Sequence, residues 1–362
     1  MGKGLAACFI LACICLWGLC SCSAEKNGTF NEYADFKDKA ELKADRIEVP
    51  PVLLYPRSVY LLNDRLVVLN EKTDTVFSVY NLPECSYWGQ FGQKGQGPGD
   101  FNLPLVYAVR TENDSFSLFD SDCLKTIVFE DNRFSVLSSK FPVENFVINN
   151  LVYLKDGSYV CSAGFESEYE LRYIFKNGTY KESGAYPEKS EGRFENVLSR
   201  NQAYSNIIVA KPDGSRLALV YQFIRRNRIY DDSGNLLSDN VMTLEPGSSE
   251  PALNDDERCI HAIAVYATDR YFYTLNLDMT AQELGTANKF PNIQVFDWNG
   301  TPVKQLYLDC YISSFVVDET NQIIYGVFAE TTVISINFVC HEILFEDHTV
   351  MLPVYSSGRY FC

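Results

Sequence analysis

The chain has 362 residues, with 31 Lys and Arg against 47 Asp and Glu, and a formal net charge of −16 at pH 7. A surface of that charge repels nucleic acid and anionic lipid headgroups, which excludes a nucleic-acid-binding protein and a basic membrane-binding patch. The 23 Tyr and 24 Phe residues lie in short apolar runs between Gly, Asn and Asp, a composition typical of an all-β protein.

The first 22 residues predict a lipoprotein signal. Lys3 precedes an uncharged apolar run over 5–20, which is short for a membrane span. The run ends in LCSC (19–22), which resembles a bacterial lipobox, where the thiol of the last cysteine is alkylated with diacylglycerol before cleavage. We therefore expect a signal peptide over 1–21 and lipidation of Cys22. The alternative is an ordinary secretory leader with incidental cysteines.

The segment 22–45 is polar and charged and has no clear core pattern. It predicts a tether or a loosely helical spacer ahead of a folded domain over 46–362. Removal of residues 1–21 takes away Lys3 and leaves a net charge of −17. Attachment to a membrane would therefore come from the lipid and not from a basic surface.

A unit of strand, tight polar turn and strand recurs six times in the remaining chain. The turns are spaced by 43 to 57 residues, which indicates an internal repeat. The six units are SVYLLNDRLVVLN (58–70), YAVRTENDSFSLFD (107–120), LVYLKDGSYVCSA (151–163), IIVAKPDGSRLALVY (207–221), AIAVYATDRYFYTLN (262–276) and SFVVDETNQIIYGVF (314–328).

A second pair of strands follows most of these units. The pairs lie at 75–91, 125–139, 171–186, 227–241 and 292–308, with a shorter version at 332–345. Asn177-Gly178 and Asn299-Gly300 predict hairpin turns, because Gly and Asn tolerate the positive φ of primed turns. Six units of four strands predict a six-bladed β-propeller, in which stacked blades bury one another. The strand that closes the ring is either 47–55 or 350–355.

Two stretches resemble a known family. LFDSDCLKTIVFEDNRFSVL (118–137) resembles an NHL-type blade, and GQFGQKGQGPGDFNLP (89–104) resembles the link between blades of that class. Together with the lipobox, the region 46–345 resembles the TolB-like six-bladed propeller lipoproteins of Bacteroides-type bacteria. The resemblance implies a fold and a location in the cell envelope, at the outer membrane and facing the periplasm or the cell surface. It implies no reaction.

The glycine-rich stretch FGQKGQGPGDFNLP (91–104) does not predict a phosphate loop. Its glycines do not match G-x-x-x-x-G-K-[ST] or G-x-G-x-x-G, and Pro98 and Pro104 precede a strand and not a helix. We therefore interpret it as a connector between two blades.

Calcium is the one metal for which the sequence leaves a site possible. Asp120 and Asp122 have a D-x-D spacing, and gluconolactonase-type six-bladed propellers hold calcium with acids and amides at the channel mouth. The EF-hand pattern is absent, and solvated loop charge is the alternative. Of the three histidines, His261 is the one near a plausible channel mouth, where it is either a catalytic or a structural residue. No H-E-x-x-H or G-x-S-x-G motif occurs. If Asp120, Asp122, Glu166 and His261 met at one cavity, catalysis would gain support.

Arg225, Arg226 and Arg228 form a basic cluster in an acidic chain. A guanidinium cluster suits carboxylate or phosphate groups, including those of acidic sugars. The alternative is pairing with nearby acids such as Asp231 and Asp232. Two segments, 188–205 and 245–259, exceed ordinary hairpin length, and long loops on a rigid scaffold often carry function.

Seven cysteines follow the lipobox, and none forms a C-x-x-C pair. Export allows disulfides, but most of these cysteines lie in strand-like apolar runs, where Cys is a small buried hydrophobe. The disulfide pattern stays open.

The sequence therefore predicts a lipid-anchored propeller that binds a protein or a glycan, without a cofactor or catalysis. The alternative is a calcium-assisted hydrolase or lyase at the channel mouth.

Overall fold

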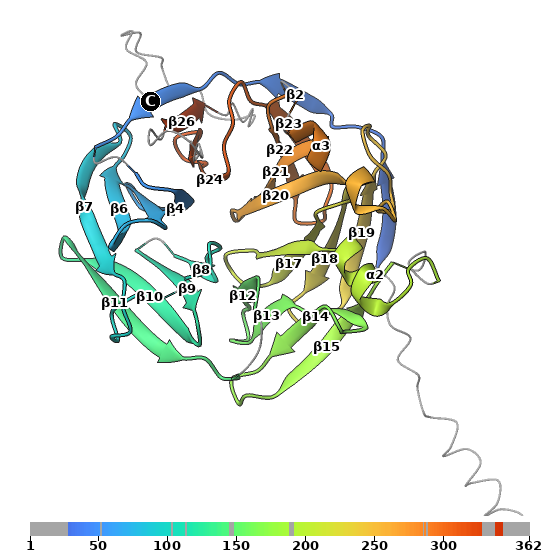
Figure 1. Cartoon of the computed structure of the whole chain (residues 1–362), viewed down its shortest axis with the longest axis horizontal. Coiled ribbons are helices and arrows are strands. Elements are labelled where there is room, and N and C mark those ends of the chain that lie inside the picture. The colour runs from blue at the N-terminus through green and yellow to red at the C-terminus, as the bar shows by residue number, and fades with distance from the viewer. Residues whose placement is uncertain are drawn as a thin grey trace, which may run out of the picture.

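Short strands and tight turns alternate along the chain, and hydrogen bonding sorts the strands into six sheets around a central axis (Figure 1). The computed structural model describes residues 28–50, 53–102, 104–112, 114–144, 148–187, 192–284, 286, 289–327 and 337–342. Within these residues the predicted all-β six-bladed propeller is confirmed.

Blades 1 to 3 are antiparallel four-stranded sheets built in chain order, with the first strand nearest the axis. Blade 1 contains β4 (Pro56–Leu62), β5 (Arg65–Asn70), β6 (Thr75–Asn81) and β7 (Ser86–Gln93). Blade 2 contains β8 (Arg110–Thr111), β9 (Ser115–Asp120), β10 (Cys123–Glu130) and β11 (Arg133–Lys140). Blade 3 contains β12 (Leu151–Tyr153), β13 (Tyr159–Ser162), β14 (Tyr169–Ile174) and β15 (Tyr180–Ala185).

Blades 4 and 5 each have a fifth strand at the rim that comes from the N-terminal region. Blade 4 contains β16 (Asn206–Ala210), β17 (Arg216–Tyr221), β18 (Arg226–Asp231) and β19 (Leu236–Met242), with β1 (Thr29–Tyr33) parallel to β19. Blade 5 contains β20 (Cys259–Ala267), β21 (Tyr271–Thr280), β22 (Asn292–Asp297) and β23 (Pro302–Tyr307), with β2 (Asp38–Glu41) parallel to β23.

Blade 6 closes the ring by combining the two ends of the domain. It contains β24 (Ser314–Asp318), β25 (Ile323–Val327), β26 (Asn337–Glu342) and, antiparallel to β26, the N-terminal strand β3 (Asp45–Glu48). The closing strand therefore comes from the N-terminal side, at the start of the predicted stretch 47–55, and the rival stretch 350–355 lies outside the described residues. The shorter second pair predicted at 332–345 supplies the single strand β26 among the residues described there.

The prediction of a polar tether is wrong over residues 29–41. Both β1 and β2 in this region are hydrogen-bonded strands, and the chain runs around the outside of blades 4 and 5 (blue in Figure 1). Their side chains are mostly exposed, because a strand at the rim covers a sheet edge with its backbone and leaves most side chains in solvent. Phe36 lies in the loop between β1 and β2 and is buried: it is 5% exposed and packs edge-to-face on Phe296.

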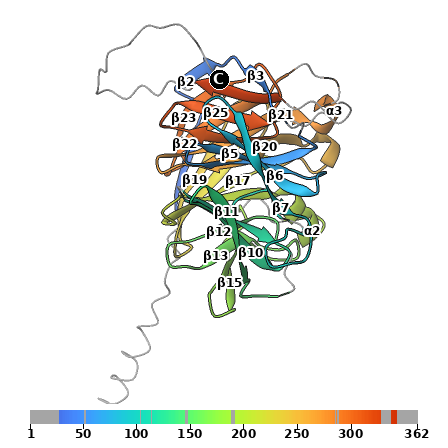
Figure 2. The same ribbon diagram turned by 90° about the vertical axis from the view of Figure 1, so that its left-hand side faces the viewer.

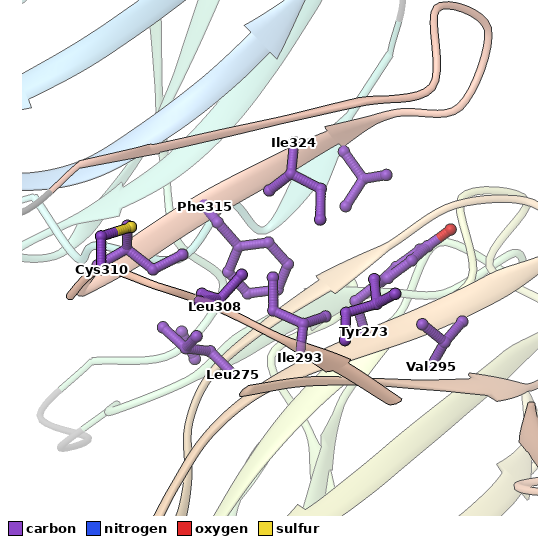
Figure 3. Packing of buried hydrophobic residues seen from close by; sticks show 12 residues of the cluster. Tyr273, Leu275, Ile293, Val295, Leu308, Cys310, Phe315 and Ile324 are labelled. Carbon is purple, nitrogen blue, oxygen red and sulfur yellow. The ribbon is translucent and has the colours of Figure 1, made fainter. Parts of the chain in front are cut away.

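The hydrophobic core lies between the blades. Among the residues that the structure describes, six clusters of buried side chains occur, and each joins two neighbouring sheets. Figure 3 shows the cluster between blades 5 and 6, where Tyr273, Leu275 and Ile293 of blade 5 pack against Phe315 and Ile324 of blade 6. Buried apolar area stabilises a fold by roughly 25 cal/mol per Å². Each blade therefore depends on both neighbours, as the repeat pattern predicted.

The two ends of the ring differ. All innermost strands run in the same sense, so the turns between first and second strands share one end, which we call the hairpin-turn face. The opposite end, the link face, carries the links between blades and the loops from second to third strands. The helices α2 (Val197–Ala203), η2 (Asp255–Glu257) and α3 (Ala281–Leu284) lie in these links and loops. Figure 2 shows α2 and α3 on the same side of the ring.

The glycine-rich stretch is a link between blades 1 and 2, as predicted. Lys94 and Phe101 form an isolated bridge, and the Asp100 carboxylate accepts a hydrogen bond from the Gly97 amide at 2.9 Å. The Phe101 ring is fully buried against Phe77. The hairpin turns at Gly178 and Gly300 are also confirmed, with φ of +80° at both glycines, whereas the preceding asparagines keep negative φ.

Candidate functional site

The innermost strands of all six blades enclose a central cavity of about 540 Å³. That volume lies within the range of small-molecule sites, roughly 300–1,000 Å³. The lining includes turn residues at the hairpin-turn face, namely Asn63, Pro212, Asp269 and Thr320. The cavity therefore extends to that face.

The cavity lining combines aliphatic side chains with aromatic and polar groups, and charged side chains lie at its rim. Half-buried side chains of Val106, Val209 and Val265 line the interior. Both signs of charge occur at the rim, with Arg110 and Lys211 on blades 2 and 4 and acidic residues on blades 2, 5 and 6, namely Glu112, Asp269, Asp318 and Glu319. The lining therefore offers both polar and apolar contacts to a small molecule.

Hydrogen bonds fix part of the rim. The Glu319 carboxylate accepts hydrogen bonds from the Thr268 hydroxyl at 2.7 Å and from the Tyr273 hydroxyl at 2.8 Å. The Arg110 guanidinium pairs with Glu112 and lies 4.7 Å from the Tyr153 ring centroid. These contacts hold the rim side chains in place without a ligand.

Two tyrosines brace the interior of the cavity. The Tyr107 hydroxyl, from the link that enters blade 2, donates to the Ile263 carbonyl of blade 5 at 2.9 Å. Blades 2 and 5 are opposite one another in a six-membered ring, so this side chain crosses the channel. The Tyr60 hydroxyl donates to the Val106 carbonyl at 2.9 Å. Burial raises the pKa of Tyr107 to about 12, so the hydroxyl keeps the proton that it donates.

The predicted arginine cluster is buried and paired, and its partners are not Asp231 and Asp232. Arg228 donates to Glu170 on blade 3 at 2.8 Å and to Asp239 on β19. Arg226 also pairs with Asp239. In the register of β18 and β19, Arg228 lies directly opposite Asp239, and Arg226 lies two positions along, opposite Val241. Asp231 instead accepts from the amides of its own turn.

This network, which we call the Glu170 network, sits between blades 3 and 4. Burial raises the pKa of Glu170, and Arg228 and the Tyr221 hydroxyl oppose that effect. Burial alone would also raise the pKa of Asp239, but hydrogen bonds from Arg226 and the charge of Arg228 hold it below its usual value. Protein carboxylates therefore pair with the guanidinium groups of Arg226 and Arg228.

Arg225 and His261 meet at a second buried carboxylate, Asp278 on β21. The His261 Nδ1 atom lies 2.8 Å from Asp278 Oδ1, and Arg225 Nη2 lies 3.1 Å from Asp278 Oδ2. The Asn292 amide also donates to Asp278 at 2.8 Å. His261 is 1% exposed and does not line the central cavity. His261 does lie at the link-face end of the inner strand β20, but its side chain is buried against Asp278 and is not turned into the channel, so the channel-mouth position predicted for it is wrong in this respect.

Acid should destabilise the protein through His261. Burial lowers its pKa, with the Arg225 and Lys289 charges acting in the same direction and Asp278 and its hydrogen bond opposing them. The unfolded chain then binds the proton more readily, so this contribution is complete above about pH 6.5 and is lost as pH falls towards the folded pKa. We expect the free energy of unfolding to fall by up to ~1.4 kcal/mol per pH unit in that window.

Urea unfolding at pH 7.5, 6.5 and 5.5 measures this effect. The His261→Gln variant cannot titrate there and should show a flatter dependence on pH than the wild type. Both proteins keep every other titratable group, so the difference isolates His261. Parallel curves for the two proteins would contradict the assignment.

The carboxylates considered for calcium do not converge. Asp120 is buried and accepts from the Asn102 amide at 2.9 Å, so it anchors the glycine-rich link. Asp122 and Glu166 are exposed on blades 2 and 3. Neither they nor His261 line the cavity. Across the described residues, no group of three or more His, Cys, Asp and Glu could hold a metal ion.

The link face over blades 3 to 5 carries the two long segments that the sequence singled out. Asn196 caps α2 by accepting from the Ser199 amide at 2.9 Å, and Asn201 fastens the helix to the Phe165 carbonyl at 2.8 Å. Arg193 pairs with Glu250, which joins the segment at 192–205 to the one at 243–258. The result is a connected surface, which we call the loop platform.

Large apolar side chains are exposed on the loop platform and beside it. Leu198 is 46% exposed and Leu253 is 59% exposed, and Phe165 and Tyr169 are exposed beside α2. Exposed apolar groups that cluster on one face mark contact sites more often than scattered ones do. The basic side chains Arg193, Arg200 and Arg258 are paired with acids.

The residues that organise both buried networks were missed in the sequence. Glu170, Asp239 and Asp278 are single acids in apolar strands, and their partners are 11 to 58 residues away. The available signal was an acidic residue in a strand whose other residues were expected to be buried. A buried acid must be paired with a cation or a hydrogen-bond donor. Cys22 lies outside the described residues. Cys85, Cys161 and Cys310 are buried, as expected for small hydrophobes.

Fold and cavity together define a six-bladed β-propeller with a ligand-sized central channel. The chain belongs to the TolB-like family: a family model described as TolB-like 6-blade propeller-like matches residues 35–320. No match was found among curated proteins.

Solved structures share the fold at low identity. A candidate exported protein from Bacteroides fragilis has 14% identity and a TM-score of 0.53, over 86% of this chain and 99% of that one. A member of the DUF4221 family from Bacteroides vulgatus has 11% identity and a TM-score of 0.58, over 83% of this chain and 97% of that one. These likenesses concern the fold alone. Within the part of the chain that the structure describes, no helix is long and apolar enough to cross a membrane.

Proposed function

We propose that this chain is a lipid-anchored binding module of the bacterial cell envelope and that the loop platform contacts a protein partner. The observation that carries the proposal is the clustering of the long segments on one face, where ion pairs connect them and Leu198 and Leu253 stay exposed. Loops held by a rigid scaffold are the usual place for binding residues. The proposal includes no catalytic step, no cofactor and no metal.

The location is supported by the N-terminal sequence. A short apolar run follows Lys3 and ends in a lipobox-like LCSC (19–22). The Bacteroides fragilis protein with the same fold is described as a candidate exported protein. An acidic chain of this charge has no basic surface to hold it at anionic lipid, so we assign attachment to the lipid on Cys22.

Replacement of the lipidated thiol should release the protein from membranes. We expect Cys22→Ala to abolish incorporation of radiolabelled palmitate and to move the protein from the detergent phase to the aqueous phase in Triton X-114. Cys20→Ala is the matched control, because it leaves Cys22 in place. Unchanged partitioning of Cys22→Ala would refute the anchor.

Photo-crosslinking on intact cells tests the partner surface. Benzoylphenylalanine at Leu253 or Leu198 should give discrete higher-mass adducts. The same group at Leu137 should give none, because Leu137 is 61% exposed on the outer strand of blade 2, away from the loop platform. Adducts at Leu137 alone would refute this surface. Loss of the adducts after enzymatic removal of glycans would identify a glycan and overturn the protein partner.

A further inference from the structure

A buried polar cluster lies beneath the part of the loop platform that joins blades 4 and 5. His261 on β20 is 1% exposed, and its Nδ1 atom lies 2.8 Å from the Asp278 carboxylate. Nδ1 therefore carries the proton of the neutral ring, which leaves Nε2 as a lone-pair acceptor. Among the residues that the structure describes, no hydrogen-bond partner reaches His261 Nε2 or the Nη1 atom of Arg225, which binds the same carboxylate. Such buried atoms are rare in native folds and occur where strain or a function maintains them.

Exposed backbone covers this Nε2 atom. A Cβ added to Gly247 would lie 2.7 Å from His261 Nε2, so the chain passes directly over the ring. Pro246, Gly247 and Ser248 are themselves exposed, so a single stretch of backbone separates the imidazole from solvent. We call residues 245–251 the cover.

Two arginines fasten the cover to the blades. The Arg225 Nε atom donates to the Pro246 carbonyl at 2.9 Å, and Arg193 donates to the Pro251 carbonyl at 3.2 Å. Arg225 also pairs with Asp278 at 3.1 Å. The carboxylate that orients the imidazole therefore also positions the arginine that holds the cover, so a change of charge at the imidazole acts on both.

The groups around His261 disfavour a positive charge on its ring. Asp278 on β21 is the negative group, whereas Arg225 before β18 and Lys289 before β22 are positive. Cys259 on β20 lies 3.9 Å from Nδ1, and burial raises the pKa of its thiol to about 11, so it is neutral. The cover faces the ring with Gly247, which has no side chain. A protonated ring would thus be a third positive group at one carboxylate, with an Nε2–H that has no acceptor under the cover.

We propose that protonation of His261 lifts the cover and so makes contact between the loop platform and its partner sensitive to pH. The partner in this statement rests on the proposed function, whereas release of the cover does not depend on it. Leu253 follows the cover by two residues, and Glu250 within the cover pairs with Arg193 of the segment at 192–205. Movement of the cover therefore loosens the connection between the two long segments of the loop platform.

The direction of the effect depends on which form of the protein binds the proton more readily. Burial lowers the pKa of His261 under the cover, and the Arg225 and Lys289 charges act in the same direction against the opposing effect of Asp278. With the cover lifted, water hydrates Nε2 and the pKa returns towards its ordinary value of about 6.5. Acid therefore favours the lifted form below about pH 6.5, by at most about tenfold per pH unit, and has no effect well above that pH.

Hydrogen–deuterium exchange followed by mass spectrometry tests the release of the cover. The mature protein is labelled for milliseconds to minutes at pH 7.5 and 5.5, and the rates are corrected for the intrinsic pH dependence of exchange. We expect peptides from 243–251 to exchange about three- to tenfold faster at pH 5.5, while peptides from α2 keep their rates. The buried strand β5 should stay unexchanged at these times, which shows that the release is local. His261→Gln should remove the acid response.

A glycine variant should release the cover without acid. In Gly247→Ala the added Cβ would meet His261 Nε2, so we expect fast exchange at 243–251 already at pH 7.5. Gly192→Ala is the matched control, because Gly192 belongs to the same platform and also has a positive φ, of +71°, but nothing lies within 4 Å of the added atom. It should keep the wild-type rates at 243–251.

Three results would overturn the release of the cover. The first is an unchanged rate at 243–251 in acid, or an increase of equal size in α2 and β5. The second is an acid response in His261→Gln as large as that of the wild type. The third is wild-type exchange in Gly247→Ala, which keeps the inference testable if His261→Gln does not fold.

Photo-crosslinking at two pH values tests the effect on the partner. Benzoylphenylalanine at Leu253 should give at least threefold less adduct on intact cells at pH 5.5 than at pH 7.5, and the same group in a His261→Gln background should give equal yields. Adducts that persist at pH 5.5 while exchange shows the cover released would overturn the link between pH and the partner. Absence of adducts at both pH values would refute the partner surface of the proposed function but not the release of the cover, which exchange measures independently.

Discussion

Replacing Arg228 with methionine should lower the free energy of unfolding by about 3–5 kcal/mol. Arg228 is 5% exposed and bridges Glu170, at 2.8 Å, and Asp239. Its loss leaves the fully buried carboxylate of Glu170 with only the hydroxyls of Tyr221 and Tyr230. Removal of one partner of a buried pair costs far more than the pair contributes, because the remaining charge cannot be hydrated. Urea unfolding of the mature protein measures the change.

A double variant separates this electrostatic cost from lost packing. Arg228→Met with Glu170→Met leaves no unpaired carboxylate at that position, because Asp239 keeps Arg226, so it should recover part of the stability. Lys39→Met is the exposed control. Its pair with Asp35 is 2.7 Å long with both side chains at least a third exposed, and it should cost under about 1 kcal/mol. A loss below about 1 kcal/mol for Arg228→Met would show that the Glu170 network is not buried as described.

The Phe36→Ala change should cost about 3–5 kcal/mol, the range for buried aromatic side chains. Phe36 lies between β1 and β2, and its ring packs edge-to-face on Phe296 with centroids 5.5 Å apart. It fastens the N-terminal chain to the core cluster between blades 4 and 5. The same chain continues into β3, which closes the ring. The loss should therefore appear as a lower unfolding midpoint of the whole domain and not as local fraying.

Phe30→Ala is the matched control for this change. Phe30 belongs to the same N-terminal chain but is 56% exposed. Its replacement should change the free energy of unfolding by no more than ~0.5 kcal/mol. If both variants behaved alike, or if Phe36→Ala left the unfolding midpoint unchanged, residues 29–41 would be a tether after all.

Repeat spacing was a strong guide to the fold because each blade is a local unit. Turn residues such as Asn177-Gly178 and Asn299-Gly300, and alternating apolar strands between them, determine the hairpins before any blade meets another. The glycine-rich link at 91–104 was assigned for the same reason. Pro98 and Pro104 are incompatible with the helix that must follow a phosphate loop, so that interpretation could be rejected from the local sequence.

The N-terminal strands could not be recognised in this way. Residues 29–41 have the composition of a polar tether because β1 and β2 cover sheet edges and bury few side chains. A rim strand is stabilised by backbone hydrogen bonds to a sheet more than 200 residues away, and backbone groups leave no trace in composition. Phe36 was the one local sign of burial.

The candidate site was also only partly recognisable from the sequence. Arg225, Arg226, Arg228 and His261 were recognisable as unusual residues, but their roles depend on Glu170, Asp239 and Asp278, which neighbouring strands and blades bring to them. Sequence position could not supply those partners, and it suggested Asp231 and Asp232 instead. Pairing inside a sheet is set by register, which places residues far apart in the chain within hydrogen-bond distance.

By itself the sequence determined the blade number, the antiparallel hairpins, the connector between blades 1 and 2 and the acidic net charge. These properties arise from local turn chemistry, alternation and composition. Tertiary structure alone decided that β3 closes the ring, that buried carboxylates pair with the arginines, and that Asp278 joins Arg225 to His261. Each of these depends on contacts between distant segments, which form only when six blades pack into one ring.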